Sequence, residues 1–425
     1  MEKKLNFWYG SIFGTYWMIY AVVCSFASVF LLAKGYNNSQ IGMTLAAANI
    51  LAVIMQPVTA DMADRSRRIG SIGISSIMTV MMMVFTLGLF FFRGGGLGIC
   101  VIFVLLLGWH TVLQPIFNAL TFKLEETGIP INFGIARSAG SLAYAIMAAI
   151  LGTLVENLGV TVIPVASEIT CIMLLISLLL TKKNFDRAMK RKGRDRGGDV
   201  DPMFAADPEK QAVIDEVPGE EPEVITLTRF ISRNRLFFVL NLGVVGLFFS
   251  NSILNTFMVQ IVTDVGGTSE DMGRILGLMA FLEIPTMVLF SRLKARFSCQ
   301  LLLKVASVGF IFKILLCWLA RSVAMLFAAQ AFQLVSFALF FPGMVYFTGE
   351  KMSKGEAVKG QALFTTMITL TTIFASLIGG WILDVSGAKT LTLIGTLATV
   401  AGAAVIISVV DRIGEKSSKP DRHKI

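Results

Sequence analysis

The sequence predicts an all-α membrane protein in which twelve transmembrane helices form two related six-helix bundles. Its composition gives the first indication, because a chain of 425 residues that is 55% hydrophobic and 15% charged is too apolar for a soluble globular protein. The second is a series of twelve apolar runs, each long enough to cross a bilayer. The third is a weak internal repeat that relates the two halves.

The apolar runs divide the chain into two sets of six. A helix needs about 20 apolar residues to span the hydrocarbon core. The first run is too long for a signal-peptide core, so we expect it to remain as the first helix. The predicted spans are 7–33, 40–62, 71–92, 97–121, 133–155, 160–181, 235–262, 273–291, 300–319, 322–348, 361–383 and 389–410. We therefore predict an N-terminal bundle at 1–181, a linker at 182–234, a C-terminal bundle at 235–411 and a tail at 412–425.

The distribution of basic residues predicts the topology. With the N-terminus inside, 30 Lys and Arg lie on the inner side, five lie on the outer side and two lie within spans. This excess follows the positive-inside rule, so both termini are expected in the cytoplasm and the protein in the cytoplasmic membrane. The net charge of +9 is thereby explained by topology, and no nucleic-acid partner is indicated.

The segment between the two sets of spans is polar. A basic block at 182–196 is followed by an acidic, proline-containing block at 199–223. Opposite charge blocks of this kind predict a solvated, largely unstructured linker. A regulatory or phospholipid-binding role of the basic block is the alternative.

Matched residues relate the two halves of the chain. An even number of spans in each half gives both halves the same orientation, as in parallel repeats around an axis normal to the membrane. The matched residues are Pro57 with Pro285 and Arg68 with Arg296, both 228 positions apart, and Pro115 with Pro342, 227 positions apart.

Four charged side chains fall deep inside the predicted spans. They are Arg137, Glu168, Glu283 and Lys313. Such residues are costly in a bilayer and usually face a watery cavity or a partner. Glu283 and Lys313 fall at similar depth on adjacent antiparallel spans, so we expect them to pair. Glu168 is interpreted either as a protonated or helix-capping residue or as a proton site.

One face of the span 133–155 favours carbohydrate binding. Arg137, Ser141 and Tyr144 lie at positions i, i+4 and i+7. A guanidinium supplies five fixed donors for hydroxyls, and an aromatic ring packs against the CH face of a sugar. The alternative is an arginine held by backbone carbonyls beside an ordinary packed tyrosine.

Further polar residues recur at helical spacing and either line a cavity or join helices. His110 is expected to be a packed histidine rather than a proton carrier. The other residues are Tyr16 and Tyr20, Asn49 and Gln56, Gln114 and Asn118, and Asn251 and Asn255.

Enzyme chemistry is not indicated. The chain has two histidines and five cysteines without CxxC spacing, and it lacks a Ser/His/Asp, metal-ligand or nucleotide-loop pattern. We therefore predict no catalytic residues, no metal and no cofactor.

The segment A60-D-M-A-D64-R65-S-R67-R68 resembles the inner-loop signature GxxxDRxGRR of the major facilitator superfamily, although Ala60 and Arg67 replace glycines. The resemblance implies two six-helix bundles around a central cavity. It also implies a latch on the inner side formed by Asp64, Arg65 and Arg68, with fixing the topology as the alternative role of these charges.

Within that superfamily the chain is most similar to the oligosaccharide:proton symporters, the group of lactose permease. The matching segments are N6-F-W, Q56-P, F133-G-I-A-R137-S-A-G-S-L-A-Y144, E283-I-P and G379-G-W-I-L-D-V-S-G387. The resemblance implies that Arg137 and Glu283 bind sugar hydroxyls and that Tyr144 stacks on the sugar ring. Asn118, Asn251 and Asn255 stand near positions where that family has acidic residues. Asn118 cannot neutralise Arg137, so Glu283 is the expected counter-ion.

The span 322–348 departs from that family. Gln330, Gln333 and Ser336 stand where the lactose permease pattern has lysine, histidine and glutamate, and Lys313 stands where it has arginine. Glutamine does not titrate, so the proton-coupling residues of that family cannot be transferred to this chain.

Together these observations predict an alternating-access secondary transporter for a small polar solute, most simply a sugar, oligosaccharide or glycoside. The predicted binding residues are Tyr20, Asn118, Arg137, Tyr144, Asn251, Asn255, Glu283, Gln330 and Gln333. Proton symport through Glu283, with Lys313 as charge partner and Glu168 as a further site, is one form of coupling. The alternatives are a nucleoside or drug transporter, including efflux, and a sugar sensor that does not transport. We expect a monomer whose only macromolecular surroundings are the lipid bilayer.

Overall fold

The computed structural model describes residues 2–65, 70–92, 95–197, 227–352 and 354–413, and these ranges are helical apart from short connections. Eleven of the helical segments in these ranges are long and apolar enough to cross a bilayer. The last of them contains two crossings, which gives the twelve spans expected. The prediction of an all-α membrane protein is confirmed.

The first bundle follows the predicted spans closely. Its elements are α1 (Glu2–Ile19), η1 (Tyr20–Ser25), α2 (Ala27–Ala33), α3 (Asn38–Arg65), α4 (Gly70–Phe91), α5 (Leu97–Glu125), α6 (Phe133–Leu158) and α7 (Val162–Gly197).

The second bundle repeats this pattern. Its elements are α9 (Leu227–Arg233), α10 (Arg235–Thr256), α11 (Met258–Asp264), α12 (Ser269–Arg296), α13 (Cys299–Leu319), α14 (Val323–Gln330), η3 (Ala331–Leu334), α15 (Phe337–Lys351), α16 (Lys354–Val409) and η4 (Val410–Arg412).

Element α16 contains the last two spans. A straight helix of 56 residues would be about 84 Å long, far more than the thickness of a bilayer. Gly387 interrupts it with φ +77°, a left-handed conformation that glycine adopts without a steric penalty. The chain therefore turns at Gly387, which agrees with the predicted spans 361–383 and 389–410.

The polar insert is more ordered than the sequence suggested. α7 continues without interruption past the predicted end of its span to Gly197, and a short helix, α9, covers Leu227–Arg233. The prediction of an unstructured linker is wrong for residues 182–197, because the basic block simply extends the preceding helix.

The matched prolines occupy equivalent helices of the two bundles. Pro57 lies in α3 and Pro285 in α12, which are the second spans of their bundles. Pro115 lies in α5 and Pro342 in α15, which are the fourth spans. This placement fits the parallel repeat expected from the constant offset.

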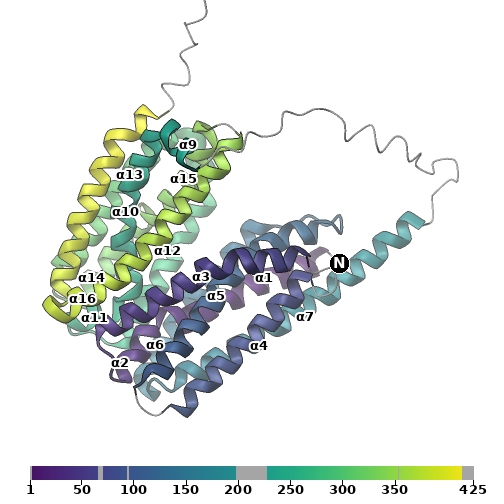
Figure 1. Cartoon of the computed structure of the whole chain (residues 1–425), viewed down its shortest axis with the longest axis horizontal. Helices are drawn as coiled ribbons and strands as arrows, with labels where there is room; N and C mark the ends of the chain where they lie inside the picture. The colour runs from purple at the N-terminus through teal and green to yellow at the C-terminus, as the bar shows by residue number, and fades with distance from the viewer. Residues whose placement is uncertain (1, 66–69, 93–94, 198–226, 353, 414–425) are drawn as a thin grey trace, which may run out of the picture.

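The two bundles meet at one end and diverge toward the other (Figure 1). Around the region labelled α2, α6, α11 and α16 they are in contact, and the buried core of the first bundle continues there into Phe257, Ile261 and Leu276 of the second. We call this the latch end. It is distinct from the inner-side latch predicted at Asp64, Arg65 and Arg68, because α3 begins here and finishes at Arg65 at the other end. The opposite end, where α7 finishes and α9 begins, is the linker end.

The first contact at the latch end is made by Asp384, near the end of the penultimate span. Its carboxylate accepts hydrogen bonds from the backbone N–H groups of Asn38, at 2.9 Å, and Ser39, at 2.7 Å, as well as from both side chains. These are the first residues of α3, so a carboxylate of the second bundle caps the N-terminus of a helix in the first.

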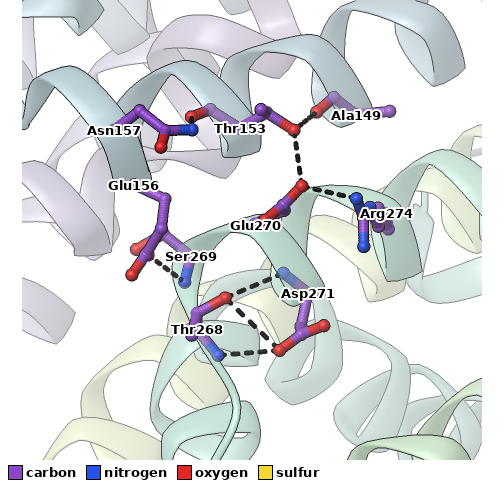
Figure 2. Close-up of polar contacts among 9 residues, drawn as sticks. All are labelled: Ala149, Thr153, Glu156, Asn157, Thr268, Ser269, Glu270, Asp271 and Arg274. Carbon is purple, nitrogen blue, oxygen red and sulfur yellow. Dashed lines mark hydrogen bonds and ion pairs between the residues drawn. The ribbon is translucent and has the colours of Figure 1, made fainter.

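The second contact is formed in the same way with the roles of the two bundles reversed (Figure 2). Glu156, near the end of α6, accepts a hydrogen bond of 3.1 Å from the backbone N–H of Ser269, the first residue of α12. Thr153 adds a bond of 3.0 Å to Glu270. All hydrogen bonds between the bundles that are found within the described ranges lie at the latch end.

Candidate functional site

A cavity of about 330 Å³ lies between the bundles and is lined by residues of both. This volume falls at the lower limit of the range usual for small-molecule sites. The residues that give the wall its chemical character are Trp17, Tyr20, Asn49, Thr111, Arg137, Ser141, Tyr144, Asn251, Asn255, Glu283, Gln333 and Thr372.

Three aromatic rings form one wall of the cavity. The Trp17 ring lies 5.2 Å from Tyr20 and 6.4 Å from Tyr144, and the two tyrosine rings are 6.1 Å apart. The Tyr144 hydroxyl is held by Ser25 at 2.9 Å. The ring planes are inclined to one another by 46° to 80°, so they form an angled apolar wall that also carries the tyrosine hydroxyls.

The local helix geometry brings these rings together. Residues Tyr20–Ser25 form a π-helical segment between α1 and α2. π-Helical segments are rare in proteins, but those that occur are often at functional sites, because the wider turn redirects the side chains. Tyr20, Cys24 and Ser25 of this segment all line the cavity.

Arg137 lies beside the aromatic wall. Its guanidinium carbon is 4.3 Å from the centre of the Trp17 ring, and Nη1 donates to the Ser141 hydroxyl at 3.1 Å. A cation over an indole face gains about 0.5–2 kcal/mol. Arg137 and Glu283 line the same cavity, but no ion pair joins them among the described residues, so the predicted counter-ion contact is not formed here.

A chain of hydrogen bonds connects the other two charges. The Lys313 ammonium donates to Oε1 of Gln333, and Nε2 of Gln333 donates to Oε1 of Glu283 at 2.8 Å. Lys313 is only 1% exposed. The expected Glu283–Lys313 pairing is therefore indirect, because the amide of Gln333 lies between the two charges.

An irregular stretch of helix positions Gln333. The 3₁₀ turn Ala331–Leu334 separates α14 from α15, and Ser336 after it has non-helical angles of φ −101° and ψ −103°. The carbonyl oxygen of Leu334 is satisfied by the Thr286 hydroxyl at 2.9 Å. This stretch presents Gln333 to Glu283 across the gap between neighbouring helices.

Two fully buried polar atoms of the cavity residues have no hydrogen-bond partner among the described residues. They are the indole N–H of Trp17 and the side-chain oxygen Oδ1 of Asn251. The amide nitrogen of the neighbouring Asn255 is used by the backbone oxygen of Asn251 at 2.9 Å. Buried polar atoms without a partner are unfavourable, so both lie where a small change of side-chain position would be needed to satisfy them.

Several predicted site residues lie outside the cavity wall. Asn118 is exposed on α5, whereas Gln330 is fully buried and donates to the Leu326 oxygen at 3.1 Å. Glu168 lies on α7 with a buried oxygen, Oε1, that has no partner within the described ranges. Seven of the nine predicted binding residues nevertheless converge on the cavity: Tyr20, Arg137, Tyr144, Asn251, Asn255, Glu283 and Gln333.

Trp17 is a site residue that the sequence interpretation missed. The helical spacing pairs Tyr20 with Tyr16, but Tyr16 is buried and stacks on His110 at 4.3 Å. His110 is itself fully buried and donates from Nε2 to the Tyr16 carbonyl at 3.1 Å, as expected for a packed histidine. The spacing i, i+3 from Trp17 to Tyr20 would have indicated the correct face.

The inner-side latch predicted at Asp64, Arg65 and Arg68 falls outside what the structure describes. Arg68 lies beyond the described residues, and α3 ends at Arg65 without a described position for the side chains of Asp64 and Arg65. Within the described ranges there is no cluster of three or more residues suited to a metal ion.

Two bundles of membrane-spanning helices around a cavity with charged and aromatic side chains are the arrangement expected of a membrane transporter. The structure is similar to that of a mutant of the nucleoside transporter NupG, with a TM-score of 0.72, 12% identity, and coverage of 95% of this chain and 99% of that one. It is also similar to a bacterial homologue of the human lysosomal transporter Spinster, in an inward-facing and unoccupied conformation (TM-score 0.65, 13% identity, 97% of both chains). A POT family transporter bound to a peptide conjugate gives a TM-score of 0.66 at 15% identity, over 97% of this chain and 96% of that one.

Residues 9–394 match the family model described as "MFS_1 like family", so the chain belongs to that family. It is a transporter of the major facilitator type and not an enzyme. No curated protein matches the chain.

Proposed function

We propose that this protein moves a hydroxylated ring solute, most simply a sugar or glycoside, across the cytoplasmic membrane by alternating access. The observation that carries the proposal is the convergence of Trp17, Tyr144, Arg137 and Glu283 on one cavity between the bundles. An aromatic platform beside charged donors and acceptors complements a ring with an apolar face and hydroxyl edges. The motifs similar to lactose permease support the same substrate class.

In this proposal the linker end is cytoplasmic and the structure is the inward-open state. The concentration of Lys and Arg toward the linker end supports the cytoplasmic orientation of that end. The hydrogen bonds that close the latch end support the inward-open state. Closure of the linker end and opening of the latch end would then expose the cavity to the outside.

Glu283 is the proposed proton site. It is the only carboxylate that lines the cavity within the described ranges, and its bond to Gln333 links it to Lys313. Proton symport follows if solute and proton occupy the site together. The role of Gln333 differs from that of the histidine expected in a lactose permease, because the amide transmits a hydrogen bond without titrating.

Nucleoside transport is a second candidate. The aromatic wall of Trp17, Tyr20 and Tyr144 suits a nucleobase as well as a sugar ring, and NupG, a nucleoside transporter, has the same fold. The test is uptake of labelled sugars, glycosides and nucleosides into proteoliposomes, with and without an inward proton gradient. Sugar uptake that ignores the gradient would remove symport. Uptake of nucleosides but not of sugars would make a nucleoside the substrate. Binding of a sugar without transport would indicate a sensor.

A further inference from the structure

The charges around the cavity do not balance. Arg137 and Glu283 line it, and Lys313 lies directly behind Gln333. Glu168, the fourth charged residue of the spans, does not line the cavity, so two cations face one ionised carboxylate among the described residues at or next to it and leave a formal charge of +1. A buried unbalanced charge is unfavourable in a membrane protein, because neither lipid nor protein replaces the lost hydration.

The existing bonds show which cation lacks a partner. Glu283 is connected to Lys313 by hydrogen bonds through Gln333, whereas it attracts Arg137 only across the cavity, without a direct ion pair between them. Arg137 has only the neutral hydroxyl of Ser141 and the face of Trp17 among the described residues. Of its five N–H donors, one is therefore used.

The neighbours of Arg137 suit a ligand rather than a structural role. The side chain is half-buried, it belongs to the cavity wall, and the Trp17 ring holds the guanidinium plane on one side. The indole N–H of Trp17 is also without a partner there. A guanidinium forms two parallel hydrogen bonds with a carboxylate, which is the strongest neutralising contact available to it.

We propose that the solute is a sugar acid, a uronate or uronide whose single carboxylate binds Arg137 while its ring packs on Trp17 and Tyr144. This inference rests on the proposed function and narrows its substrate class. While Glu283 is ionised, a monoanion brings the formal charge of the site to zero, whereas a phosphate ester, with nearly two negative charges, would reverse it.

The test compares matched pairs of ligands on the purified full-length chain. Binding of methyl glucuronide and methyl glucoside, and of the corresponding galacto- and manno-configured pairs, is measured by calorimetry in lipid nanodiscs. A charge-assisted bidentate contact predicts that one uronide binds about 10- to 100-fold more tightly than its neutral partner.

The variant Arg137→Gln should abolish this preference, because it weakens binding of the uronide more than binding of the neutral glycoside. Arg137→Lys, which keeps the charge but not the paired donors, should retain part of the preference. The matched control is Arg321→Gln, which removes an exposed cation far from the cavity wall and should change nothing.

The outcomes separate this inference from the proposed function. Equal or tighter binding of the neutral glycosides overturns the sugar-acid inference but is consistent with the proposed function as a sugar transporter. Retention of the uronide preference in Arg137→Gln overturns the role of Arg137. Tighter binding of methyl glucoside 6-phosphate refutes the monoanion argument. If no sugar of either kind binds, both the proposed function and the inference fail.

Discussion

Replacing Asp384 with asparagine should shift the protein away from the conformation in which the latch end is closed. The carboxylate accepts bonds from two backbone and two side-chain groups at the start of α3. Asparagine keeps one acceptor oxygen but loses the charge and the second acceptor.

The size of the effect follows from the contacts. A helix cap contributes about 0.5–2 kcal/mol, and a negative charge at a helix N-terminus adds about 0.3–1 kcal/mol. Asp384 is exposed, so we use the lower half of these ranges and expect about 1–1.5 kcal/mol. The ratio of closed to open latch ends should fall about 5- to 12-fold, since 1.4 kcal/mol is a factor of ten.

Spin labels on exposed positions of the two bundles would report the change. Leu158 at the end of α6 and Arg321 after α13 are both exposed at the latch end and belong to different bundles. Double electron–electron resonance between labels at these positions, with the five native cysteines replaced, should show a longer distance gaining population in Asp384→Asn.

The matched control is Asp271→Asn. Asp271 also caps a helix at the latch end, because it accepts a bond of 3.0 Å from the Thr268 N–H, but this contact lies within one bundle. If the two variants shift the distance distribution equally, or if Asp384→Asn leaves it unchanged, the contact between bundles is not what holds this end closed.

Three further outcomes are expected. Trp17→Ala should weaken solute binding about 5- to 30-fold in calorimetry by removing both the ring surface and the support of Arg137, whereas Trp17→Phe should lose less; equal losses would contradict a role of the aromatic surface. Gln333→Leu should separate Glu283 from Lys313 and lower the free energy of unfolding by about 2–4 kcal/mol, because the two charges lose their bridging amide. The measurement is a thermal melt, and an unchanged melting temperature would mean that the two charges pair directly. Gly402→Ala should destabilise the second bundle by about 1–3 kcal/mol, because the new Cβ would lie 2.4 Å from the Gly243 carbonyl oxygen. The control in the same thermal assay is Gly349→Ala, because Gly349 is exposed and has open space around its Cβ position.

The helices were predictable because apolar length decides where a chain crosses a bilayer. The spans, the repeat and the convergence of Arg137, Tyr144 and Glu283 all follow from local pattern or from the family resemblance. The constant offset between the halves also placed the matched prolines in equivalent helices.

The departures occurred where the backbone leaves the ideal helix. The 3₁₀ turn at Ala331–Leu334 rotates the side chains within and after it relative to the preceding helix, and regular helical spacing cannot predict this rotation. Gln330 and Gln333 therefore point to different surroundings, one buried beside Leu326 and one on the cavity. Asn118 stands near a family position that binds sugar, but the fold places it outside the cavity wall, and sequence spacing alone does not reveal this.

The two contacts at the latch end have the form of an interface between identical subunits. Glu156 and Asp384 are 228 residues apart, the same offset as Pro57 and Pro285. Gly152 and Gly380, which pack closely against the opposite helices, are also 228 residues apart. Each half gives one carboxylate and receives one, as related patches do across a twofold axis. A single six-helix unit with this sequence pattern could have closed the same end by pairing with its own copy. Duplication would then have joined two halves that already fitted each other.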